Sequence, residues 1–159
     1  CTILMETLTG ADLNLVLGDL VVAMVRANNE KGAGQFSSTN FIGALVEVRP
    51  LAPTNAPRRG VRTNEFRIDV DWDFLKTYEQ RGGSTIDSYE LQIDDGASGT
   101  FLEVVGFTTY YTLNSILVSS NINSGLTYRL RYRAHNVQGW SDFSPEASII
   151  AATIPGALT

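Results

Sequence analysis

The chain has 159 residues, of which 43% are hydrophobic, and a formal net charge of −5. This composition supports an apolar core in roughly one to one and a half small domains and excludes a globally disordered chain. The negative charge argues against nucleic acid as a partner, because nucleic-acid binding is driven by neutralising phosphates. No apolar run reaches the roughly 18 residues of a membrane-spanning helix, so no membrane span is expected.

Residues 1–50 are predicted to form short strands separated by turns. Residues 1–10 are expected to form a strand, and alternating leucines then lead into a turn at Gly18. Further strands are expected at residues 20–27 and 41–48, and the prolines that follow predict a stiff linker.

The strand expected at residues 20–27 has apolar residues on both faces. Its inward positions are Val21, Ala23, Val25 and Ala27. The outward residues Val22 and Met24 are apolar as well. A strand that is apolar on both faces is normally covered on both faces, so we expect another segment or subunit to pack on Val22 and Met24.

The remainder of the chain shows strand patterns with turn signals every eight to twelve residues or so. The expected strands are residues 52–57, 65–74, 87–94, 101–105, 110–117, 128–135 and 147–152. No stretch of useful length has helical periodicity. The predicted fold class is therefore all-β, and the architecture a β-sandwich.

Two stretches of the chain share a sequence pattern. Shifting the first by 107 residues onto the second matches Gly18 with Gly125, Arg26 with Arg133, Ala27 with Ala134, Asn29 with Asn136, Gly32 with Gly139, Phe36 with Phe143 and Ser37 with Ser144. The chain therefore contains a repeat about one domain long.

The second half carries motifs of a known family. They are Trp72, Tyr89-x-Leu91 and Tyr128-x-Leu130-x-Tyr132-x-Ala134-x-Asn136-x-x-Gly139-Trp140-Ser141. Across residues 51–155 these motifs resemble a fibronectin type III domain, which implies an immunoglobulin-like sandwich. The resemblance implies Trp72 as the core tryptophan and Tyr128 as the tyrosine whose hydroxyl ties down the preceding corner. The implied core signature comprises Trp72, Tyr89, Leu91, Tyr128, Leu130, Tyr132 and Ala134.

The same resemblance implies two domains. Residues 1–50 look like the C-terminal half of a fibronectin type III-like domain plus a linker, with Val21 at the position of Tyr128. Residues 51–159 look like a complete domain that ends in a linker. The sequence pattern is similar to that of fibronectin-type arrays in very large secreted or surface proteins, of which ciliated protists carry many. This implies an extracellular or cell-surface location.

Cys1 is the single cysteine, so no disulfide can form within the chain. An odd cysteine in a secreted protein suggests a partner outside the visible sequence. An external disulfide and a free thiol both stay open.

No pattern predicts an enzyme, a cofactor or a metal site. His135 is the only histidine and is expected on the outer face of a strand, without a nearby cysteine or serine. Asp69, Asp71 and Asp73 offer oxygen ligands, but their period of two spreads them along one strand face. No N-x-S/T glycosylation site occurs, and O-linked sugar on residues 37–39 is left open.

Charged residues are expected on opposite sheets of the sandwich. One sheet presents the three aspartates at residues 69–73, and the other presents arginines at positions 129, 131 and 133. One interpretation is that Glu90 and Asp94 pair with these arginines across neighbouring strands. The other is that copies pack acidic side to basic side.

Three strands of a sandwich cannot cover their own apolar face, so residues 1–50 need a complement. The missing strands could lie upstream in a longer array, residues 51–155 could cover the half domain, or a neighbouring copy could complete it. A neighbouring copy could add its tail at residues 152–159 to an open edge, which gives head-to-tail assembly. The candidate interface residues are Leu13, Leu15, Val22, Met24, Ile154 and Leu158.

The sequence therefore predicts a structural module of an extracellular fibre or surface array. Its partners are expected to be copies of itself or neighbouring repeats of the same polypeptide. The alternative is a cell-adhesion or ligand-binding module whose loops contact a protein or a sugar.

Overall fold

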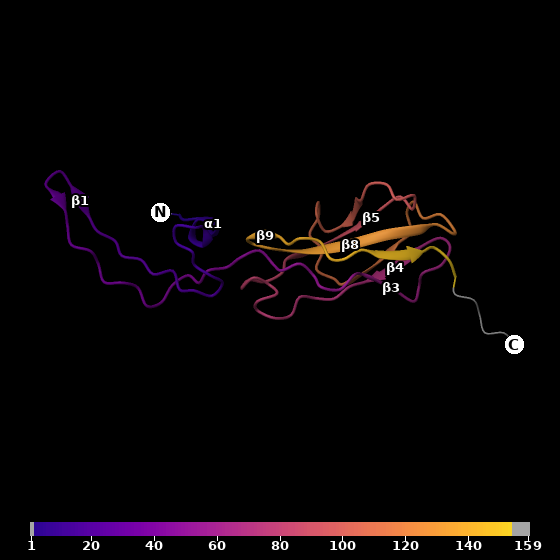
Figure 1. Cartoon of the computed structure of the whole chain (residues 1–159), viewed down its shortest axis with the longest axis horizontal. Coiled ribbons are helices and arrows are strands. Elements are labelled where there is room, and N and C mark those ends of the chain that lie inside the picture. The colour runs from indigo at the N-terminus through magenta and orange to yellow at the C-terminus, as the bar shows by residue number, and fades with distance from the viewer. Residues whose placement is uncertain (1, 154–159) are drawn as a thin grey trace. The chain divides into compact units, whose positions relative to one another are not determined.

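A computed structural model describes residues 2–153 and separates the chain into two compact units (Figure 1). The first unit is Cys1–Val48 and the second is Arg49–Thr159. The division lies two residues before the one predicted at residue 50. The predicted residues Cys1, Ile154 and Leu158 lie outside the described residues.

The second unit contains two antiparallel sheets. The smaller sheet has the order β3-β4-β7, with β3 at Arg58–Arg59, β4 at Ile68–Asp71 and β7 at Ser115–Val118. The larger sheet has the order β10-β8-β5-β6, with β10 at Ala147–Ile150, β8 at Thr127–Asn136, β5 at Ser88–Ile93 and β6 at Leu102–Val105. The short strand β9 (Gly139–Trp140) pairs with the end of β8. The predicted all-β sandwich is confirmed.

The core of the second unit lies between the two sheets. Strand β8 alternates buried and half-buried residues along its length, as a strand with one face on a core does. The residues of the predicted core signature lie together in this core: Trp72, Tyr89, Leu91, Tyr128, Leu130, Tyr132 and Ala134. The rings of Trp72 and Tyr132 are 5.9 Å apart between centroids, so the two sheets meet through large aromatic side chains.

The hydroxyl group of Tyr128 holds the corner before β8. It accepts a hydrogen bond from the main-chain N–H of Asn123 at 2.8 Å and donates one to the carbonyl of Asn121 at 3.2 Å. Asn121 has a φ of 59°, so the chain turns sharply there.

Phe66 lies outside the core, although the predicted strand 65–74 places it inward. Its side chain is 68% exposed. The reason is that β4 begins only at Ile68, because a bridge between Asn64 and Arg67 closes a tight turn before it. The alternation that would bury Phe66 therefore starts two residues later.

The first unit begins with a helix where the sequence predicts a strand. Helix α1 (Met5–Thr9) occupies the range expected as a strand at residues 1–10, so that prediction is wrong. A strand needs a partner for its main-chain groups, and the described part of this unit supplies none at this place. The chain closes local bonds instead, from the N–H groups of Thr7 and Leu8 to the carbonyl of Leu4.

Residues 18–46 form a long two-armed hairpin, which we name the ribbon. Strands β1 (Asn28–Asn29) and β2 (Gly32–Ala33) form its tip (Figure 1). The prediction of continuous strands at residues 20–27 and 41–48 is wrong, because a side chain replaces some of the main-chain hydrogen bonds between the two arms. The side-chain oxygen of Asn40 accepts from the N–H of Ala23 at 2.6 Å, and its amide nitrogen donates to the carbonyl of Val21 at 2.9 Å.

Candidate functional site

The tip of the ribbon repeats the β8–β9 hairpin of the second unit. The ribbon pairs Asn28 with Ala33 and Asn29 with Gly32, and the hairpin pairs His135 with Trp140 and Asn136 with Gly139. These positions differ by 107 residues throughout, as in the sequence repeat. Gly32 and Gly139 have φ values of 130° and 123°, which a residue with a Cβ rarely adopts.

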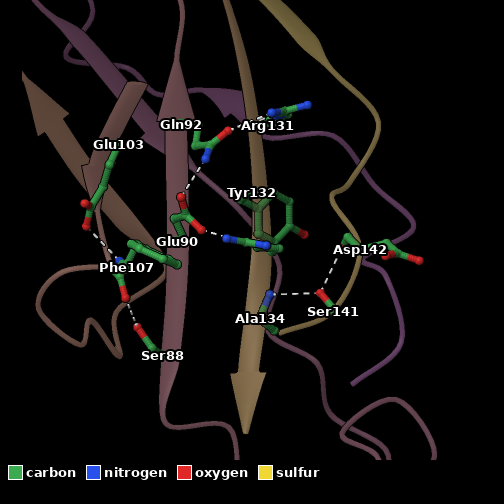
Figure 2. Close-up of polar contacts among 12 residues, drawn as sticks. Ser88, Glu90, Gln92, Glu103, Phe107, Arg131, Tyr132, Ala134, Ser141 and Asp142 are labelled. Atoms are coloured by element: carbon green, nitrogen blue, oxygen red, sulfur yellow. Dashed lines mark hydrogen bonds and ion pairs between the residues drawn. The ribbon is translucent and has the colours of Figure 1, made fainter. Parts of the chain in front are cut away.

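The arms of the ribbon also repeat main-chain hydrogen bonds of the hairpin. The N–H of Gly34 donates to the carbonyl of Ala27 at 2.9 Å, as Ser141 donates to Ala134 at 2.8 Å. Figure 2 shows a further bond of the hairpin, from the N–H of Ala134 to the hydroxyl of Ser141 at 3.1 Å, which Gly34 of the ribbon cannot repeat because it has no side chain. In both places a serine then closes the arms. Ser37 accepts from the N–H of Val25 and Ser144 from the N–H of Tyr132, each at 3.1 Å.

The correspondence extends back to the corner before the first arm, with one exchange of partners. Asn14 has a positive φ of 47°, as its equivalent Asn121 has. Val21 replaces Tyr128 and brings no hydroxyl group. The carboxylate of Asp19 supplies the acceptor instead: it accepts a hydrogen bond from the N–H of Val16 at 2.8 Å. Val16 is the equivalent of Asn123, whose N–H donates to the hydroxyl of Tyr128.

The two hairpins differ in what lies beside the first arm. Strand β8 pairs with β5 from Ser88 opposite His135 to Ile93 opposite Leu130. At the equivalent ribbon positions, no residue within 2–153 hydrogen-bonds to the main-chain groups of Val22, Met24 or Arg26. We name the main-chain groups of these three residues the open edge. It is the edge at which β8 receives its neighbour.

The side chains of the ribbon are exposed on both faces. Val22 is 59% exposed and Met24 51% exposed, and Val25 and Phe36 are exposed as well. By contrast, Tyr132 of the hairpin, the equivalent of Val25, is 1% exposed. Leu13 is also exposed, and Leu15 is half-buried. Among the described apolar residues of the first unit, Leu8 and Val46 are buried. The described candidate interface residues are therefore available to a partner.

The arginines on the outer face of β8 are paired within the second unit. Arg133 meets Glu90 at 2.6 Å and Arg129 meets Asp94 at 2.8 Å. Arg131 donates to the side-chain oxygen of Gln92 (Figure 2). Their guanidinium groups also lie over aromatic rings, of Phe101, Phe143 and Trp140. Burial alone would raise the pKa of Asp94, but hydrogen bonds from Arg129 hold it below its ordinary value. The arginines form cross-strand pairs, not a free basic side.

The aspartates on the smaller sheet are paired as well. Asp69 is buried and meets Arg62 at 2.7 Å, and Asp73 accepts two hydrogen bonds from Arg58 at 2.9 Å. These arginines hold the pKa values of both carboxyl groups below their ordinary range. Within residues 2–153, no three histidine, cysteine, aspartate or glutamate side chains gather as metal ligands.

Comparison with known proteins places this fold. No family model matches the chain. Domains A168–A170 of titin match with a TM-score of 0.59 and 19% identity, over 82% of this chain and 40% of that one. A fourth fibronectin type III domain from human matches with a TM-score of 0.57 and 20% identity, over 77% and 95%. A fibronectin type III domain derived from the human KIAA0970 protein matches with a TM-score of 0.50 and 13% identity, over 68% and 79%.

The fold is fibronectin type III. Its two sheets are the β3-β4-β7 and β10-β8-β5-β6 sheets of the second unit. Fibronectin type III domains occur in structural and adhesion proteins and are generally non-enzymatic modules. At these identities the likeness shows the fold and nothing of the partner.

Two further features of the fibronectin type III unit are the surroundings of His135 and a groove between two strands. His135 lies half-buried on the outer face of β8, where its ring is 4.7 Å from that of Trp140 between centroids and its Nδ1 lies 2.7 Å from the carboxylate of Asp87. A groove of about 620 Å³ lies between β6 and β7, with Leu102, Ile116 and Tyr128 among its lining residues.

Within residues 2–153, no helix has the length and apolar character needed to cross a bilayer.

The sequence analysis missed three residues that build the ribbon. Asp19 replaces the corner tyrosine, and Asn40 and Ser37 bridge the arms. Only Ser37 carried a signal, since it matches Ser144 in the repeat. The exchange of Tyr128 for Asp19 leaves no trace in a residue-by-residue match.

Proposed function

We propose that this chain is a structural module of an extracellular fibre or surface array. Its modules associate by strand pairing and burial of apolar side chains, between repeats of one polypeptide or between protomers. The observation that carries the proposal is the open edge of the ribbon together with the exposed side chains of Val22 and Met24.

Strand physics supports an assembly role. Unpaired N–H and C=O groups along an edge are a template for another strand, and proteins normally cover or charge such edges. A two-stranded ribbon is marginal by itself in water. Covering Val22 and Met24 adds about 25 cal/mol for each Å² of apolar surface removed from water. The ribbon therefore gains stability from a partner that the second unit does not need.

The location and the partners belong to the same proposal. Copies of this chain or neighbouring repeats are the proposed partners, outside the cell or on its surface. The resemblance to fibronectin-type arrays of secreted and surface proteins supports this placement. Glycans on residues 37–39 and an external disulfide at Cys1 are compatible with it.

Sedimentation velocity over a range of concentrations, with electron microscopy of the same samples, tests the proposal. The chain is expected to form higher-order species, and Val22→Lys with Met24→Lys should suppress them. Val137→Lys is the matched control, because Val137 is an exposed apolar residue of the second unit. A monomer at all concentrations, with both variants indistinguishable from the parent, would contradict assembly between protomers.

A ligand-binding or adhesion module is the second candidate. The groove between β6 and β7 favours it, since apolar walls with a few polar groups are typical of ligand sites. On this account the chain is a monomer, and Leu102→Lys abolishes binding to a cell surface or a glycan array. Binding that survives Leu102→Lys would exclude the groove.

A further inference from the structure

We infer that the open edge of the ribbon takes up an antiparallel strand of the β5 type, with a carboxylate side chain opposite Arg26. This deepens the proposed function and rests on it for its biological meaning. The inference names the partner's chemistry: an extended, mainly apolar segment with an acidic residue at one defined position, opposite Arg26.

The internal repeat identifies which edge is incomplete. In the second unit, the carbonyl of Arg129 accepts from the N–H of Asp94, and the N–H of Arg129 donates to that residue's carboxylate at 2.9 Å. Val22 is the equivalent of Arg129 in the ribbon, and its main-chain groups meet no residue within 2–153. The other side of the same arm is already bonded to the second arm, as in the hairpin.

The repeat also defines the register of the missing strand. Tyr89, Leu91 and Ile93 of β5 lie opposite Ala134, Tyr132 and Leu130 of β8. Transferred to the ribbon, these three positions face Ala27, Val25 and Ala23. The incoming strand therefore places apolar residues on the face of Val25, and it covers a side chain that is now exposed.

Arg26 defines the charge of the partner. Its equivalent, Arg133, contacts Glu90 of β5 at 2.6 Å, and Glu90 has a side chain only 2% exposed. Both arginines stack on a phenylalanine ring, at 4.8 Å from Phe36 for Arg26 and 4.5 Å from Phe143 for Arg133. The guanidinium of Arg26 thus lies over the equivalent ring, and no carboxylate within residues 2–153 forms an ion pair with it.

Val22 and Met24 make the expected strand differ from β5 itself. They stand where Arg129 and Arg131 stand in β8, whose partners are Asp94 and Gln92. Apolar residues in the partner suit Val22 and Met24 better, because a polar group facing them would lose water without gaining a hydrogen bond. One acidic residue among apolar ones is therefore the recognition pattern.

A second copy of the same edge does not fit this pattern. Residues 20–28 contain no acidic side chain, so two such edges in antiparallel pairing leave Arg26 without a carboxylate. The outer strand β6 carries Glu103, but this carboxylate already accepts from the N–H groups of Phe107 and Thr108 at 2.7 Å. A separate strand of the β5 type is the better match.

The test tethers such a strand to the intact chain. Residues 86–95 with Gln92→Leu and Asp94→Leu (IDSYELLILD), which place apolar side chains opposite Met24 and Val22, are fused before residue 1 through a flexible Gly-Ser linker of about 20 residues, which keeps the strand at a high effective concentration. Amide exchange of Val22, Met24 and Arg26 is then measured by NMR, with the unfused chain as reference. We expect exchange at these amides to slow at least about 10-fold.

Charge reversal makes the test specific. Glu90→Lys in the tethered strand should remove the protection, and Arg26→Glu in the ribbon should restore it with that lysine strand. Amides that exchange equally fast with and without the tether would overturn the inference, as would protection indifferent to the two charges. Protection that grows with protein concentration in the unfused chain would also overturn it, because a second copy would then fill the edge.

The outcome separates this inference from the proposed function. Protection by the tethered strand, together with an unfused chain that is monomeric at all concentrations, supports the strand site and contradicts assembly between protomers. Assembly of the unfused chain, together with no slowing of exchange at Val22, Met24 and Arg26 in the tethered chain, supports the proposed function and overturns the inference.

Discussion

The ribbon of the first unit and the β8–β9 hairpin of the second share one main-chain design but differ in cover. Both have the same register at the tip, the same serine bridge between the arms and left-handed residues at equivalent places. Strand β8 has a neighbour on each side and a core beneath it. The first arm of the ribbon has a neighbour on one side only. Local sequence therefore sets the hairpin, and the other strands set its burial.

The comparison also separates residues that shape the hairpin from residues that fill the core. Asn29 and Ser37 match their equivalents because their side chains bond to the main chain, and Gly32 matches because its φ is positive. Val21 and Val25 stand in place of Tyr128 and Tyr132, whose rings fill the space between two sheets. Side chains that depend on the missing sheet are the ones that differ.

The largest contrast is expected from truncating equivalent core positions. Tyr132→Ala should lower the free energy of unfolding of the second unit by about 3–5 kcal/mol, as other large buried aromatic residues do. Val25→Ala should change the ribbon by less than about 0.5 kcal/mol, because Val25 is exposed. Urea unfolding followed by tryptophan fluorescence reports the second unit, since both tryptophans lie there, and NMR amide signals of the ribbon during the same titration report the first unit. Equal costs at the two positions would break the comparison.

Removing the buried carboxylate of β5 is expected to rank second. Glu90→Ala leaves the half-buried Arg133 without its ion pair and should cost about 3 kcal/mol, the lower end for broken buried pairs. Glu90→Gln keeps a hydrogen-bond acceptor and should cost less. Arg26→Ala is the matched control and should be nearly neutral. Urea midpoints measure all three, and a neutral Glu90→Ala would weaken the charge argument for the open edge.

The serine bridges offer a smaller, matched contrast. Ser144→Ala leaves the buried N–H of Tyr132 without its side-chain acceptor, which should cost about 1–3 kcal/mol. Ser37→Ala exposes the N–H of Val25 to water, which replaces the bond. We therefore expect less than about 0.5 kcal/mol there. NMR of the Val25 amide would show whether the arms stay together without the serine.

Acidification should produce a graded loss confined to the second unit. Asp69, Asp73 and Asp94 have folded-state pKa values below the ordinary value of about 3.9. Their stabilising effect is complete above that value and is lost as the pH falls through the lowered pKa values. The midpoint temperature of thermal unfolding should be nearly constant from pH 7 to pH 5 and should decrease below about pH 4. Asp94→Asn should flatten the decline, and a rise in stability on acidification would contradict these pairings.

Alternation of apolar and polar residues predicted most of the second unit. Strand β8 and the residues around Trp72 follow that pattern, because a strand with one face on a core must alternate. Phe66 fits the same alternation, but its side chain lies outside the core. The tight turn at Asn64 that displaces it cannot be predicted from periodicity. The pattern locates a strand better than it locates the strand's first residue.

The first unit was predicted less well, for a physical reason. A strand at residues 1–10 and a continuous strand at residues 20–27 presuppose neighbours that supply hydrogen bonds. Without them the chain forms α1, and the side chain of Asn40 bridges the arms. The repeat alone pointed to the ribbon, and the open edge followed only when the two hairpins could be compared bond by bond.

Amide hydrogen exchange of the unmodified chain tests the central claim most directly. The main-chain groups of Val22 and Arg129 occupy equivalent positions in the two hairpins, and only Arg129 is bonded to a neighbouring strand. We predict that the Val22 amide exchanges within about 10-fold of an unstructured peptide and the Arg129 amide at least about 1,000-fold more slowly, as in a stable core. Equal protection of the two amides in dilute solution would contradict the open edge and the assembly that we derive from it.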